Sequence, residues 1–242
     1  MTPTLPKAAN ALSNVGKFPQ WRAMGIPISD VLKALFYIED SGSFFIPVQK
    51  AACTSIAAAI RKIPTHDSTD ATLSSVASWR NPMHVGCVPQ DFRSGARLAF
   101  TVVRHPVARF WSAYNHLVVQ GGDARIGSVV RNSLRLQADR PLTPDLLLRY
   151  VESHPVDDLY FAFRPQYAVC GVEMLPIRVA KFENLTGDLA QLVTEGYLPK
   201  DFLSYLGKRN NRNSSEVHER HRCLDGKVAE VYGRDLAVFG YC

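Results

Sequence analysis

The sequence of 242 residues lacks any apolar stretch long enough to cross a membrane as a helix, which takes about 20 residues. Its N-terminal residues also lack the apolar core of a secretory signal. With no leader or anchor visible, we expect a cytoplasmic protein without a membrane span. Internal repeats are absent as well, and 46% hydrophobic with 21% charged residues is typical of a globular chain.

The sequence also lacks the cysteine pairs of a disulfide framework or a zinc ribbon. Its five cysteines are Cys53, Cys87, Cys170, Cys223 and Cys242, and no two of them form a CxxC pair. We therefore expect buried, reduced thiols. His218 and His221 stand near Cys223, but histidines on a basic stretch are usually solvated, and we assign no metal.

Acidic residues are outnumbered by basic ones, 22 against 28, which gives a net charge of +6. A positive field attracts phosphorylated or sulfated ligands, anionic lipid and nucleic acid. The excess is too small to distinguish between these ligands. The positions of the basic residues have to distinguish them.

Three apolar runs are predicted to be strands, over residues 43–48, 98–103 and 177–181. The helices predicted around them span residues 30–38, 55–63, 106–119, 143–152, 184–193 and 224–232. Strands that alternate with helices indicate an α/β fold with a parallel sheet flanked by helices. Residues 1–28, with four prolines and little periodicity, are predicted to be an irregular arm, and 29–242 to be a single domain.

The first informative segment is a strand that runs into Lys-Ala-Ala-Cys-Thr-Ser, residues 50–55, at the mouth of a helix. A helix N-terminus binds phosphate, Lys50 adds a full charge, and Thr54 and Ser55 add hydroxyl donors. No glycine lies between Ser43 and Val85, so this is not the glycine-rich loop of the ATPases. Taken alone, an ordinary capped helix with a surface lysine explains the segment equally well.

A second strand–loop–helix unit favours anion binding. Arg104 ends the strand over residues 98–103, where ligands bind in an open α/β sheet, and Ser112 lies two turns into the following helix. An arginine and a serine there make a second phosphate site. Two such units in one sheet favour a phosphate-binding role over simple packing.

The two segments resemble motifs of one family, the sulfotransferases. Residues 50–55 are similar to the loop that holds the 5′ phosphosulfate in that family, and residues 104–114 to its 3′-phosphate motif. Residues 164–170, 179–183 and 232–241 resemble later motifs of the carbohydrate branch, which includes the Golgi-type and 2-O-sulfotransferases (sulfotransferase family 2). The sequence departs from that branch at Val48-Gln49, where proline usually precedes the lysine, and in the missing membrane anchor.

The resemblance implies a P-loop-NTPase-like fold and 3′-phosphoadenosine-5′-phosphosulfate (PAPS) as the donor, with adenosine 3′,5′-bisphosphate as the product and no metal. It places Lys50 in catalysis, because charge grows on the leaving 5′ phosphate. The acceptor is expected to be a hydroxyl on a glycan or a glycosylated small molecule. The donor-binding residues that it implies are Lys50, Ala51, Ala52, Cys53, Thr54, Ser55, Arg104 and Ser112, with Arg212 and Ser214 in a late polar loop.

The acceptor hydroxyl must lose a proton, and His84 is the candidate base, because the pKa of histidine lies near the working range. His105, which follows Arg104, is the alternative. Two other functions stay open: a P-loop-like kinase or nucleotide hydrolase, and a non-catalytic module that binds polyanions. Arg104 stands where a kinase would need a carboxylate, and the informative charges lie at strand ends, so we expect no nucleic-acid partner.

Overall fold

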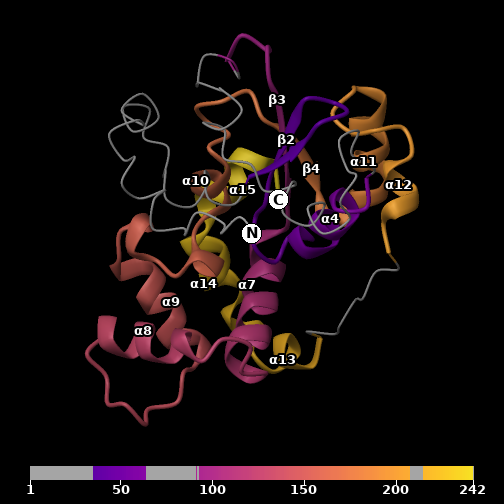
Figure 1. The fold of residues 1–242 in the computed structure, drawn as a ribbon. Helices are drawn as coiled ribbons and strands as arrows, with labels where there is room; N and C mark the ends of the chain where they lie inside the picture. Colours follow the sequence, from indigo (N-terminus) through magenta and orange to yellow (C-terminus); the bar gives the residue numbers. More distant parts are fainter. Residues whose placement is uncertain (1–34, 64–90, 92, 208–214, 242) are drawn as a thin grey trace, which may run out of the picture.

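The computed structural model describes residues 35–63, 91, 93–207 and 215–241. These residues form one mixed sheet with the strand order β1–β2–β3–β4, flanked by helices (Figure 1). The strands are β1 (Phe36–Ile38), β2 (Ser43–Ile46), β3 (Leu98–Val103) and β4 (Arg178–Lys181). Strands β2, β3 and β4 are parallel, as predicted, whereas β1 pairs antiparallel with β2, so the prediction of an all-parallel sheet is wrong at this edge.

The departure at β1 comes from a tight turn. The predicted helix over residues 30–38 is wrong for Phe36–Ile38, and its earlier part lies outside the described residues. Gly42 adopts a φ of 63° and donates its N–H to the carbonyl of Glu39 at 3.2 Å. Glycine reaches this left-handed region at little cost, so the chain reverses and pairs Phe36 with Phe45.

The central strands are apolar and buried on both faces, as parallel strands between helix layers are. Thr101 is the exception in β3, and its hydroxyl donates to the carbonyl of Ile46 at 2.8 Å. The α-helices are α4 (Cys53–Ile60), α7 (Pro106–Tyr114), α8 (Arg125–Ser133), α9 (Pro144–Ser153), α10 (Gln166–Cys170), α11 (Leu185–Thr194), α12 (Phe202–Tyr205), α13 (Ser215–Arg220), α14 (Asp225–Val231) and α15 (Gly233–Phe239).

The helices fall into two groups around the sheet. Helices α4, α11 and α12 lie on one side of it, and α10 and α15 on the other (Figure 1). Helix α7 leads away from the sheet into a helical layer with α8, α9 and α14, where Trp111 and Tyr150 are among the buried side chains of a second apolar cluster. Helix α7 continues into a π-helix, Asn115–Val119. The two together cover the single helix predicted over residues 106–119.

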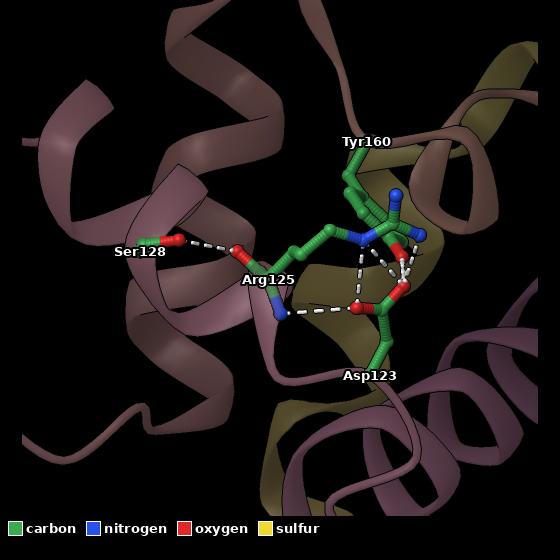
Figure 2. Close-up of polar contacts among 4 residues, drawn as sticks. All are labelled: Asp123, Arg125, Ser128 and Tyr160. Atoms are coloured by element: carbon green, nitrogen blue, oxygen red, sulfur yellow. Dashed lines mark hydrogen bonds and ion pairs between the residues drawn. The ribbon is translucent and has the colours of Figure 1, made fainter.

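A polar cluster braces this helical layer (Figure 2). The carboxylate of Asp123 accepts the backbone N–H of Arg125, the first residue of α8, at 3.0 Å, and pairs with the Arg125 guanidinium at 2.7 Å. Tyr160 donates its hydroxyl to the same carboxylate from a separate loop. Tyr160 also donates its backbone N–H to the hydroxyl of Tyr150 on α9, so the cluster joins three segments.

The other predicted elements are confirmed within a few residues of their bounds. The helices predicted over 55–63, 143–152, 184–193 and 224–232 appear as α4, α9, α11 and α14, whereas α8, α10, α12, α13 and α15 were not predicted. Of the cysteines that the structure describes, Cys170 is buried as expected, Cys53 is half-buried and Cys223 is exposed. Among the described residues, no helix combines the length and apolarity needed to cross a membrane. The predicted boundary at residue 28 lies outside them.

Candidate functional site

The first loop of the site joins β2 to α4 through a strained backbone. Lys50 has a φ of 67° and Ala52 a φ of 62°, in the left-handed region that residues other than glycine rarely enter. Each such residue costs about 1–2 kcal/mol. Strain of this kind is tolerated where the surrounding structure holds it, and it concentrates at functional sites.

The start of α4 leaves backbone N–H groups free and carries no acidic side chain. Its first backbone bond runs from the Ile56 N–H to the carbonyl of Ala52 at 3.0 Å, so the N–H groups before Ile56 have no partner within the helix. The first turn holds no acidic side chain, and Thr54 and Ser55 are exposed. The unpaired N–H groups and the positive end of the helix dipole therefore directly follow the strained loop that contains Lys50.

The second loop joins β3 to α7 and contacts the first. Arg104 ends β3 and donates from Nη1 to the carbonyl of Lys50 at 3.5 Å. Its guanidinium lies 4.6 Å from the ring centroid of Phe182, which follows β4. The two basic residues predicted from the sequence thus lie side by side at the carboxyl edge of neighbouring parallel strands.

Both cations are partly withdrawn from water. Burial is the main cause that lowers the pKa of Lys50, with Cys53 opposing it and Arg104 adding to it. Burial also lowers the pKa of Arg104, against the opposing effect of Glu183 and Tyr241. Two half-buried positive charges with lowered pKa values gain stability from an anion placed between them.

Buried polar residues hold the second loop in place. Gln166, which is fully buried, accepts the backbone N–H of Arg104 at 2.9 Å and donates to its carbonyl at 2.8 Å. Asp235, also fully buried, accepts the N–H groups of Gln166 and Tyr167 at 2.9 Å each. Burial raises the pKa of Asp235, with the charge of Arg109 opposing it. The motifs around Gln166 and Asp235 therefore serve to position Arg104.

A buried arginine of α7 holds the backbone of the first loop. Arg109 of α7 is 2% exposed and donates from Nε to the carbonyl of Gln49 at 3.0 Å. Its Nη2 has no hydrogen-bond partner among the described residues. Burial lowers the pKa of this guanidinium, and the nearby Tyr232 and Asp235 oppose that effect.

Comparison with known protein families gives a match over most of the chain. A model of the sulfotransferase family matches residues 33–242. The chain belongs to the sulfotransferase family. Searches of curated proteins and of solved structures found no match to this sulfotransferase. The matched span contains both loops and the residues that hold them.

The structure of this sulfotransferase brings some of the predicted site residues together, and others lie outside the residues that it describes. Residues 50–55 and Arg104 come together. Ser112 is half-buried on α7, and its side chain makes no hydrogen bond within the described ranges. His105 precedes α7, with its ring 5.2 Å from that of Tyr241. His84, Arg212 and Ser214 lie outside the residues that the structure describes.

The pair His218 and His221 is not simply solvated, which corrects the expectation. Both rings stack on Trp111, and His218 Nε2 lies 2.9 Å from a carboxylate oxygen of Asp225. Asp225 also accepts the indole N–H of Trp111 at 2.7 Å. In the described part of the sulfotransferase, no cluster of three or more His, Cys, Asp or Glu could hold a metal ion.

Sequence reasoning missed Arg109, Gln166, Asp235 and Glu183 as supports of the site. All four stand in segments that the family resemblance singled out. The resemblance marks such positions, but it does not say which backbone groups they bond. Only the fold brings Gln166 to Arg104, 62 residues earlier in the chain.

Proposed function

We propose that this sulfotransferase moves a sulfuryl group from PAPS to a hydroxyl of a carbohydrate. The contact between the two loops, in which Arg104 reaches the carbonyl of Lys50, carries the proposal. PAPS has one anionic group at each end of its ribose, and these two basic loops offer it two adjacent anion sites. A nucleotide with a single phosphate chain would leave one site unused.

The 5′ phosphosulfate fits the first loop. Lys50, the backbone at Ala51, Ala52 and Cys53, and the hydroxyls of Thr54 and Ser55 surround the N-terminus of α4. The small side chains of the two alanines let a ligand approach the backbone.

The 3′ phosphate fits the second loop. Arg104 supplies a planar guanidinium that binds phosphate oxygens in pairs. Ser112, Arg212 and Ser214 remain proposed contacts of the donor. The residues that hold Arg104 would fix it before the donor arrives, which lowers the entropy lost on binding.

In the transfer, the acceptor oxygen attacks sulfur in line while the bond from sulfur to the 5′-phosphate oxygen breaks. The electron pair of that bond stays on the leaving phosphate, where negative charge grows. Lys50 and the helix N-terminus stabilise that charge, and positioning supplies the rest of the catalysis, as in phosphoryl transfer. The acceptor proton goes to a base, for which we propose His84, with His105 as the alternative.

Binding of adenosine 3′,5′-bisphosphate tests the donor assignment directly. At about 100 times its dissociation constant this ligand should add about 2.7 kcal/mol of stability, which is about 5–11 °C in melting temperature for a chain of this size. Chelator should not reduce the shift. A shift with ATP and Mg²⁺ but none with the bisphosphate would instead indicate a kinase or a nucleotide hydrolase.

Substitution of the two basic residues tests their separate roles. Lys50→Ala should lower turnover by about 10²–10³, because Lys50 acts on charge that develops in the transition state. Arg104→Ala should instead weaken binding of the bisphosphate by about 10–100-fold, the worth of a charged hydrogen bond. Arg178→Ala, an arginine of β4 paired with Glu195, is the matched control. Titration calorimetry and turnover with a labelled donor would refute these roles if the two variants behaved alike.

A further inference from the structure

A cluster of side chains beyond the two anion sites surrounds the end of β3. Glu183, which follows β4, accepts the backbone N–H of His105 at 2.7 Å through Oε1. Its other oxygen, Oε2, accepts the hydroxyl of Tyr241 at 2.9 Å. His105 is the residue directly after Arg104, so one carboxylate connects the arginine loop with the segment after α15.

Tyr241 is itself held by the end of α15. Gly240 adopts a φ of 60°, and the N–H of Tyr241 bonds back to the carbonyl of Leu236 at 2.9 Å, which is a glycine-dependent helix cap. Lys181 donates to the carbonyl of Gly240 at 3.1 Å, and its ammonium lies 4.6 Å from the Tyr241 ring centroid. The tyrosine is therefore held by the helix cap and Lys181 as well as by the His105 ring of the arginine loop, whose centroid lies 5.2 Å from its own.

We propose that Glu183 and Tyr241 form a positioning pair that fixes the β3–α7 loop, and with it Arg104, for the 3′ phosphate of the donor. The proposal rests on the proposed function and names two residues that act through a third. Neither residue needs to touch the donor. Glu183 holds the backbone beside Arg104, the Phe182 ring lies against its guanidinium, and Tyr241 fixes the orientation of the Glu183 carboxylate.

Both members of the pair can be changed without opening the core, since Glu183 is exposed and Tyr241 is half-buried. Glu183→Ala removes both acceptor oxygens. Glu183→Gln keeps one oxygen for the His105 N–H and removes the charge, so it separates the hydrogen bond from electrostatics. Tyr241→Phe removes only the hydroxyl. Glu195→Ala, which breaks the exposed pair with Arg178 at the other end of β4, is the matched control.

The experiment measures the dissociation constants of adenosine 3′,5′-bisphosphate and adenosine 5′-monophosphate by titration calorimetry for the wild type and these variants. We expect Glu183→Ala to weaken the bisphosphate about tenfold, the worth of one hydrogen bond, and the monophosphate less than twofold. Glu183→Gln should recover most of the loss. Tyr241→Phe should add little once Glu183 is alanine, because the two residues act as a unit.

Three outcomes would overturn the proposal. If Glu183→Ala leaves the bisphosphate constant unchanged while the wild type binds it, the pair does not position Arg104. If the two nucleotides weaken equally, the effect is general damage and not a role in 3′-phosphate binding. If the wild type binds no bisphosphate at all, the proposed function fails and the pair has no donor to position.

Discussion

Replacement of Gln166 by leucine should destabilise the protein strongly, although the two side chains are similar in size. The Gln166 amide makes two hydrogen bonds to the backbone of Arg104, at 2.9 and 2.8 Å, and is fully buried. Leucine would leave the N–H and the carbonyl of Arg104 unpaired. An unsatisfied buried polar group costs about 1–3 kcal/mol, so the pair costs about 2–6 kcal/mol.

The lower half of that range is the better expectation, because Arg104 is only half-buried and water can reach part of its backbone. A loss of about 3 kcal/mol corresponds to a fall of about 6–12 °C in melting temperature for a chain of this size. Calorimetry and urea denaturation would measure it. Gln191→Leu is the matched control, since Gln191 is exposed and its side chain bonds Glu195 alone within the described ranges, and it should change the melting temperature by less than about 2 °C.

Comparison of Gln166→Leu with Gln191→Leu tests whether Gln166 anchors the second loop. If Gln166→Leu melts within the range of the control, the two bonds to Arg104 contribute no net stability, and the assignment of Gln166 as the anchor of the second loop is wrong. If it is destabilised but binds adenosine 3′,5′-bisphosphate as tightly as the wild type, the anchor supports the fold alone and the orientation of Arg104 comes from Glu183 and Phe182.

Three further perturbations test other parts of the structure. His84→Ala should abolish transfer by about 10²–10⁴ with donor binding intact, and near wild-type transfer would move the base to His105. Asp123→Asn should cost stability at neutral pH, but the difference should vanish as the pH falls well below about 4 in urea titrations, because hydrogen bonds from Arg125 and then Tyr160 hold the pKa of this carboxyl below its usual range. Thr143→Ala should cost about 0.5–2 kcal/mol by removing the side-chain cap of α9, whose oxygen accepts the Leu146 N–H at 3.4 Å, whereas Thr143→Ser should cost little.

Strands and long helices could be predicted because their apolar pattern follows directly from burial. Strand β3 is a continuous apolar run, and it occupies the residues predicted for it. Strand β1 was missed because Phe36–Ile38 is too short to show a period, and the turn at Gly42 decides its structure. The short helices α10 and α15 begin after segments that carry no cap signal, and long-range bonds hold them, from the Gln166 N–H to Asp235 and from Lys181 to the carbonyl of Gly240.

The charged residues of the candidate site were predictable for a different reason. Parallel strands end at one edge of a sheet, so basic residues just after two such strands must lie near each other, and Lys50 and Arg104 do. No rule of spacing predicts that the amide of Gln166 bonds the backbone beside them. A buried polar side chain finds its partner through the packing of the whole chain, which the sequence pattern does not display.

The strain in the first loop gives a physical reason to expect that the two proposed anion sites depend on each other. Lys50 and Ala52 hold left-handed backbones without the glycine that would make this easy, at a cost of about 1–2 kcal/mol each. The loop must therefore be held from outside. Among the described residues, two hydrogen bonds from outside reach its backbone, from the Nε of Arg109 to the carbonyl of Gln49 and from the Nη1 of Arg104 to that of Lys50, and both arginines belong to the β3–α7 unit. Since that unit also carries the proposed 3′-phosphate site, a change that loosens it should disturb both ends of the donor, and the first loop is not expected to keep its shape alone.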